Sequence, residues 1–136
     1  MADKLFKVLW FVAAWHNFIG GALFLIFSNQ VYTRSDLNPP EPGIHYQTWI
    51  GLIFVFGLTY YMVYRDMYAN RNLVFISILG KFVSAFPMLG SMILISDQIP
   101  KLFIIPIVTD FVFGLLFIAF FLFAMRNQKW SGQPTL

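Results

Sequence analysis

Four side chains that can carry chemistry interrupt apolar stretches of this sequence: His16, Asn17, Lys81 and Asp110. An ionisable group within an apolar span is costly, so it usually faces a partner, a ligand or water. The chain has no cysteine, which excludes thiolate catalysis, disulfide exchange and cysteine-bound metals or clusters. His16 has no acidic residue three or four positions away, and we therefore predict no metal site.

Lys81 belongs to a stripe of polar and soft side chains that recurs every three or four residues, which is the spacing of one helix face. We expect this stripe to face protein or water, with Phe75 and Phe86 on other faces. It has two interpretations: a seam of small residues at which helices pack, or a crevice for a ligand or for protons. The stripe consists of Ser77, Lys81, Ser84, Met88 and Ser91.

The candidate residues of a ligand or proton pocket are His16, Asn17, Lys81, Ser84 and Asp110. His16 is expected in the same layer as Lys81, and we expect it to be neutral because two adjacent cations repel each other. It also has a structural interpretation, as an interior histidine hydrogen-bonded beside Asn17. Glycines at positions 20, 21, 51, 57, 80 and 90 are expected where helices pack closely.

The depths of Lys81 and Asp110 bear on whether the two form a pair. Lys81 lies ten residues after Arg71, about 15 Å from one membrane face. Asp110 lies nine residues after Lys101, about 14 Å from the other face. The span lengths then separate their Cα atoms by about 10 Å in height. Because helical side chains lean toward the N-terminus of their own helix, we expect the two to lean apart. A direct pair would need a bent lysine or a bridging water.

Helices that cross a membrane must position these side chains. Hydrophobic residues make up 59% of the 136-residue chain and charged residues only 11%, which is too apolar for one water-soluble core. Four apolar runs each approach or exceed the roughly 20 residues that span a bilayer, and short links join them. We predict an all-α fold, a single antiparallel bundle of four transmembrane helices over residues 1–136, with spans at 5–27, 48–64, 73–95 and 102–125.

The links between the spans set the orientation. The first link, 28–47, is predicted to be a loop because it contains a proline-rich turn at 38–43. Basic residues are more frequent on the cytoplasmic side of membrane proteins, and six lie on one side against two on the other. This places both termini in the cytoplasm. The six are Lys4, Lys7, Arg65, Arg71, Arg126 and Lys129; the two are Arg34 and Lys101. These charges form no basic patch, which excludes a nucleic-acid partner.

Short motifs in the second and third spans resemble DoxX-like and BphX-like small bacterial membrane proteins. They lie at residues 56–60 (FGLTY), 65–66 (RD), 70–74 (NRNLV) and 79–81 (LGK). The resemblance implies a four-helix protein of the bacterial inner membrane, in a group whose members include proteins similar to quinone-linked oxidoreductase subunits or accessory membrane subunits. It carries over no catalytic residue. The cysteine chemistry of vitamin K epoxide-type quinone reductases is excluded, since this chain has no cysteine.

We therefore expect a non-catalytic small membrane protein with the lipid bilayer as its surroundings. It would act as an accessory subunit of a larger membrane complex, or bind an apolar ligand such as a quinone or a lipid. Other membrane subunits or further copies of the chain are its expected protein partners. The alternative is an intramembrane enzyme or proton-coupled carrier that uses His16, Lys81 and Asp110. A small channel is a third possibility, although few polar residues line any one path.

Overall fold

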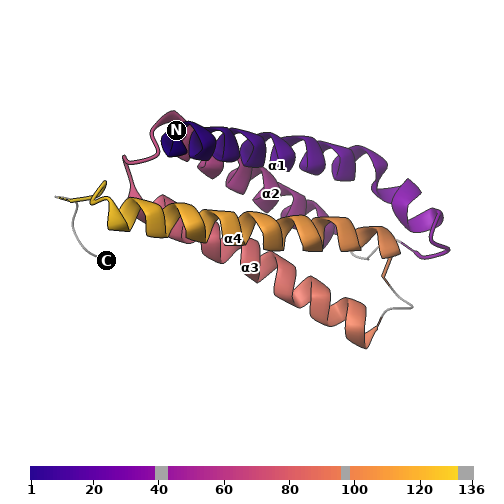
Figure 1. The fold of residues 1–136 in the computed structure, drawn as a ribbon. Coiled ribbons are helices and arrows are strands. Elements are labelled where there is room, and N and C mark those ends of the chain that lie inside the picture. The colour runs from indigo at the N-terminus through magenta and orange to yellow at the C-terminus, as the bar shows by residue number, and fades with distance from the viewer. Residues whose placement is uncertain (39–42, 96–98, 132–136) are drawn as a thin grey trace.

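The computed structural model describes residues 1–38, 43–95 and 99–131, and their regular structure is entirely helical (Figure 1). The four long helices are all apolar enough to cross a membrane, which confirms the predicted all-α fold with four candidate spans. In chain order the elements are α1 (Ala2–Thr33), α2 (Gly43–Arg65), α3 (Arg71–Leu94), the short 3-10 helix η2 (Lys101–Phe103) and α4 (Ile104–Arg126).

The first predicted loop is shorter than expected. Helix α1 continues to Thr33 and α2 already begins at Gly43, so the prediction of a loop over 28–47 is wrong at both ends. The prediction followed apolar residues only, whereas a helix can continue past the hydrocarbon where water satisfies its polar side chains. Aromatic packing supports the extension, because the Tyr32 ring lies 6.3 Å from Tyr46 and 6.0 Å from Phe103. Residues 39–42, the centre of the proline-rich turn, lie outside the described part.

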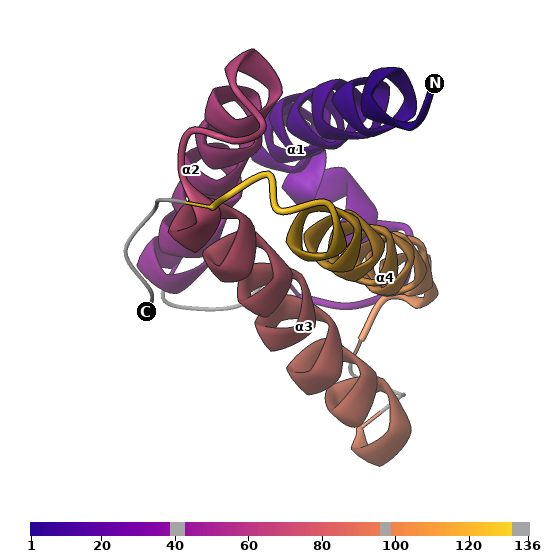
Figure 2. The ribbon, with the colours of Figure 1, turned by 60° about the vertical axis from the view of Figure 1, so that its left-hand side comes forward.

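The helices form two antiparallel pairs, as the short links predicted. Helix α1 packs mainly on α2, and α3 mainly on α4. Figure 2 shows α3 diverging from α2 toward its C-terminal end. The N-terminus and Ser131, the last described residue, lie at one end of the bundle (Figure 1), which we call the terminal end. The other end, with the α1–α2 and α3–α4 connections, is called the opposite end.

A dense aromatic cluster joins three helices near the terminal end. The indole of Trp10 stacks on Phe117 at 4.0 Å between ring centroids, with 14° between the ring planes. Phe120 meets Trp10 edge-on at 5.6 Å, and Tyr60 lies 5.1 Å from Phe117. All four side chains are almost completely buried. After α4, Trp130 covers the cluster by packing edge-on against Phe120. These aromatic side chains form a large part of the hydrophobic core.

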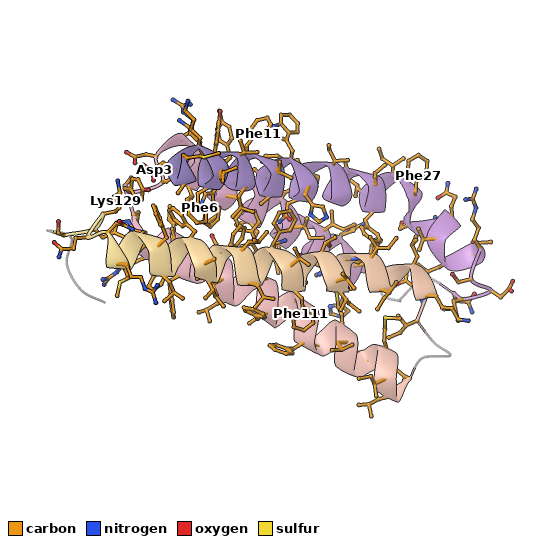
Figure 3. The ribbon with its side chains drawn as sticks, in the orientation of Figure 1. Asp3, Phe6, Phe11, Phe27, Phe111 and Lys129 are labelled. Carbon is orange, nitrogen blue, oxygen red and sulfur yellow. The ribbon has the colours of Figure 1, made fainter. Side chains whose placement is uncertain are left out.

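Polar contacts at the terminal end hold together segments that are distant in the sequence. Asp3 accepts a hydrogen bond of 2.9 Å from the Tyr68 hydroxyl and lies 3.6 Å from the ammonium group of Lys129 (Figure 3). At the start of α3, the Asn70 side chain accepts hydrogen bonds from the backbone N–H groups of Asn72 and Leu73, which caps the helix. The N-terminus, the α2–α3 link and the chain after α4 therefore meet here.

Glycines separate into close-packed and open positions. A Cβ atom at Gly57 would lie 2.9 Å from the Phe18 ring of α1, and one at Gly80 would overlap the Phe56 ring of α2. The expectation of close packing is confirmed for Gly21, Gly57 and Gly80, and it is wrong for Gly20, Gly51 and Gly90, where such an atom would meet nothing within 4 Å.

The outer surface of the bundle is apolar along all four helices. Phe11 and Phe27 of α1 (Figure 3) are 41% and 46% exposed. Leu115 of α4 and Val83 of α3 are more exposed still. Such a surface is unsuited to water and suited to lipid, and the internal hydrogen bonds of the helices satisfy their backbone groups there. We therefore conclude that the protein is a four-span integral membrane protein.

Candidate ligand cavity

A cavity of about 550 Å³ lies between the two helix pairs. All four long helices contribute to its wall. The aromatic side of the wall comes from Phe24 of α1 and from Trp49, Phe56 and Tyr60 of α2. Most other lining residues are apolar, and five of the lining side chains are polar or charged, so the interior is largely apolar.

The five side chains predicted from the sequence all line this one cavity: His16, Asn17, Lys81, Ser84 and Asp110. They come from α1, α3 and α4, which converge near the middle of the bundle. Asn17, Lys81 and Asp110 are buried, while His16 and Ser84 are half-buried at the cavity wall.

Lys81 and Asp110 form a buried ion pair, with 2.6 Å between the lysine Nζ and the aspartate Oδ1. The prediction that the two side chains lean apart is therefore wrong. That estimate gave each side chain the average lean of a helical residue, but the four-carbon lysine stem is flexible enough to turn toward the carboxylate. In a low-dielectric interior, an unpaired ammonium and an unpaired carboxylate are each very costly. This cost outweighs the preference of the lysine stem for its own N-terminal side.

A chain of hydrogen bonds extends the pair to the other two helices. The Lys81 ammonium also donates to the Asn17 side-chain oxygen at 3.1 Å, and the Asn17 amide nitrogen donates to the backbone carbonyl of Ile53 at 3.1 Å. This series of hydrogen bonds thus links α4, α3, α1 and α2 in that order. Because both polar atoms of the Asn17 side chain have a partner, this residue has a structural role in supporting Lys81.

Aromatic rings enclose the ammonium group. The Nζ atom of Lys81 lies 5.2 Å from the Tyr60 ring centroid and 5.3 Å from that of Phe113. A cation over a ring face is attracted to its π-electrons, most strongly where water is absent. The charge on Lys81 is therefore compensated by a carboxylate, an amide oxygen and two rings.

His16 lies beside this network on the cavity wall. Its ring centroid is 5.3 Å from that of Phe113. The Nδ1 atom is buried and has no hydrogen-bond partner among residues 1–38, 43–95 and 99–131. The geometry therefore leaves one ring nitrogen with unused hydrogen-bonding capacity next to a cavity.

The polar stripe of α3 divides into two parts. Ser77 is fully buried and its hydroxyl donates to the Leu73 carbonyl at 2.7 Å, as expected of a packing seam. From Lys81 onward the stripe lines cavities instead, with Ser84 and Met88 at the large one. Phe75 and Phe86 do not line either cavity and are exposed, which agrees with the prediction that they lie on other faces than the stripe. The packing-seam interpretation therefore applies to the part of α3 around Ser77, and the crevice interpretation applies to the part from Lys81 onward.

The cavity opens sideways, between α2 and α3. Leu52 of α2 and Leu79 and Val83 of α3 line it, and yet they are 52%, 47% and 70% exposed. Side chains that border both a cavity and the outer surface form its rim. Since that surface faces lipid, the rim connects the cavity to the hydrocarbon of the bilayer.

A second cavity of about 270 Å³ lies toward the opposite end. Tyr32, Tyr46 and Phe103 line it, together with Ser91. It shares Trp49, Pro87 and Met88 with the large cavity. These three side chains therefore form the partition between the two spaces.

Sequence reasoning missed the aromatic wall from α2, most of all Tyr60. A tyrosine within an apolar span is a polar group in the same sense as Asn17 and could have been included with it. A further signal was available, because Trp49, Ile53, Phe56 and Tyr60 recur at intervals of four, three and four residues, which places them on one helix face.

No three His, Cys, Asp or Glu side chains within the described ranges lie close enough together to hold a metal ion. The chain matches no protein-family model, no curated protein and no solved structure. The resemblance to DoxX-like proteins therefore depends on the motifs at 56–81 alone.

Proposed function

We propose that this membrane protein binds one apolar ligand, a quinone or a lipid, which enters from the bilayer between α2 and α3. The observation that carries the proposal is the cavity itself. It is largely apolar, it is open toward lipid, and hydrogen bonds join Asn17, Lys81 and Asp110 into one polar cluster in its wall. This is the arrangement expected for a molecule with an apolar body and a small polar head.

The size of the cavity supports a ligand rather than a packing fault. A volume of about 550 Å³ falls within the range of roughly 300–1,000 Å³ typical of small-molecule sites. An empty space of that size would cost considerable stability, because its lining would lose dispersion contacts. An occupant taken up from the membrane restores those contacts.

Two other functions predict different behaviour. An accessory subunit would use its lipid-facing helix surfaces to contact larger membrane proteins, and it would remain bound to them in mild detergent. An enzyme or proton-coupled carrier would need a reactive group at the cavity. Against this, Lys81 and Asp110 neutralise each other, which leaves neither as an unpaired nucleophile or base.

The proposal is tested by extracting the protein after purification in mild detergent. Organic extracts of wild-type protein are analysed by mass spectrometry for a bound apolar molecule in stoichiometric amount. Gly20→Leu is the cavity-filling variant, because Gly20 lines the cavity and has open space at its Cβ position. Gly51→Leu is the matched control, since Gly51 has equal space but does not line the cavity.

We expect wild type and Gly51→Leu to retain the molecule and Gly20→Leu to lose most of it. Equal retention by all three proteins would place the ligand elsewhere on the surface. Co-purification of large subunits with an empty cavity would favour the accessory function instead.

We further propose that both termini face the cytoplasm of a bacterial inner membrane. The six basic residues of the predicted cytoplasmic side belong to the terminal end, against Arg34 and Lys101 at the other. Because the chain has no native cysteine, single cysteines report orientation directly. In intact cells, an impermeant thiol reagent should label Asp36→Cys and leave Asn70→Cys unlabelled. The reverse pattern would overturn the orientation.

A further inference from the structure

We propose that the cavity selects a ligand whose polar head carries no net charge, and that this head lies near the middle of the membrane beside His16 and the Lys81–Asp110 pair. This inference rests on the proposed function, because it specifies the ligand of the same cavity. It excludes phospholipids and other amphiphiles with ionised heads.

The charge balance of the cavity is the first argument. Lys81 and Asp110 are the charged residues among its lining side chains, and they lie 2.6 Å apart as an ion pair. A free cation at the cavity would attract phosphate or carboxylate, but here the ammonium is already neutralised by Asp110. An ionised head would therefore lose its hydration without gaining an opposite charge.

The hydrogen-bonding capacity of the cavity is the second argument. Lysine has three N–H donors, of which the Lys81 contacts to Asp110 and Asn17 use two. The buried Nδ1 atom of His16 has no partner in the described part of the chain. On α3, Pro87 has no N–H group, so the Val83 carbonyl lacks its usual helical donor. These groups suit a head with one or two neutral oxygen atoms.

The depth of the polar groups is the third argument. Lys81 lies ten residues from the start of α3 and Asp110 nine residues from Lys101 at the start of η2. Along the helices these spacings correspond to about 15 Å and 14 Å from the two polar ends, deep within a hydrocarbon layer of about 30 Å. A phospholipid keeps its charged head at the membrane surface. A single-tailed molecule with a small neutral head can place that head at mid-depth.

The test compares three probes that share a sixteen-carbon tail and differ in the charge of the head: hexadecanol, palmitate and hexadecylammonium. Binding of tritiated hexadecanol to the full chain is measured by scintillation proximity in non-ionic detergent at about pH 8, where histidine is ordinarily neutral. The three unlabelled probes then compete for the site. We expect hexadecanol to compete about tenfold or more better than either charged probe, which corresponds to about 1.4 kcal/mol.

Charge variants provide the internal control. Asp110→Asn leaves the Lys81 cation uncompensated and should shift the preference toward palmitate. Lys81→Met leaves the carboxylate and should shift it toward hexadecylammonium. The double variant Lys81→Met/Asp110→Asn restores neutrality and should again prefer hexadecanol. Thermal unfolding in the same detergent identifies any variant that fails to fold, and the wild-type comparison does not depend on the variants.

The possible outcomes distinguish the neutral-head inference from the proposed ligand site. If wild type binds palmitate or hexadecylammonium as tightly as hexadecanol, the neutral-head inference is overturned while the proposed ligand site stands. If no probe binds but the organic extract contains a molecule, the charge of its head at pH 8 decides: a neutral head supports the inference and an ionised head overturns it. If no probe binds and the extract is empty, the proposed function fails and the inference fails with it.

Discussion

The terminal half and the opposite half of this bundle are built from the same kinds of residues but packed in different ways. Near the terminal end, Trp10, Phe117 and Phe120 interlock with almost no exposed surface. Farther along, α3 diverges from α2 (Figure 2) and two cavities lie between the helices. Aromatic content alone therefore does not produce a dense core. The difference indicates that the packing of one half holds the fold together, whereas the helices of the other half leave open space between them.

Removing one tryptophan from each half tests whether the two halves differ in packing. Trp10→Ala should lower the free energy of unfolding by about 3–5 kcal/mol, because it leaves a large void in a packed core. Trp49→Ala should cost less than half of that, since Trp49 already borders both cavities. Thermal unfolding in detergent measures both. Equal losses would mean that the two halves are packed equally tightly.

Two glycines of α2 test the same difference in packing within a single helix. A Cβ atom at Gly57 would lie 2.9 Å from the Phe18 ring and 3.3 Å from the Asn17 Cβ atom, so Gly57→Ala should destabilise by about 1–3 kcal/mol through overpacking. Gly51→Ala should be neutral or slightly stabilising, because nothing lies within 4 Å and alanine favours helix. Unfolding temperatures of the two variants give the answer. Destabilisation at Gly51 alone would contradict this packing of α1 on α2.

The smallest expected effect concerns the polar contacts at the terminal end. Burial and the neighbouring Asp3 carboxylate raise the pKa of Tyr68 from its usual 10 to about 12. The folded state therefore holds the phenol proton more tightly than the unfolded state. This contribution to stability is complete below pH 10 and is lost as the pH rises through 12.

Asp3→Asn should lower the Tyr68 pKa and cost no more than about 1 kcal/mol at neutral pH, because these contacts are partly exposed to solvent. Ultraviolet absorbance of tyrosinate, recorded during a pH titration of wild type and variant, reports the shift. Tyr68→Phe identifies which part of the titration belongs to this residue. An unchanged titration in Asp3→Asn would show that Asp3 does not act on Tyr68.

Much of the architecture could be predicted from hydropathy, since the membrane imposes a length on each span and helices are the only open-chain solution. Five of the residues that line the cavity could also be predicted, because a polar side chain within an apolar span is costly and is easily recognised in the sequence. The extension of α1 to Thr33 could not, since helix beyond the hydrocarbon leaves no apolar signal. The Lys81–Asp110 contact was missed because average side-chain directions ignore the energy of an unpaired charge.

A crevice was one of two interpretations of the α3 stripe, but the size and exact position of the cavity could not be predicted, for a different reason. Gly21 and Gly20 are neighbours in the same helix, and one packs against α2 while the other faces empty space. Which of the two borders a void depends on the divergence of α3, a property of the whole bundle. Residue type alone does not determine it.

The Lys81–Asp110 ion pair matters most, because the cavity wall carries no net charge only if the two residues are paired. The proposed preference for a neutral ligand depends on this charge balance. A double-mutant cycle of Lys81→Met, Asp110→Leu and the combined variant, followed by thermal unfolding in detergent, tests the ion pair most directly. Either single change should destabilise by about 3 kcal/mol or more, since it strands a buried charge. The double variant should recover much of the loss, with a coupling energy well above about 1 kcal/mol. Additive effects of the two single changes would contradict the pair.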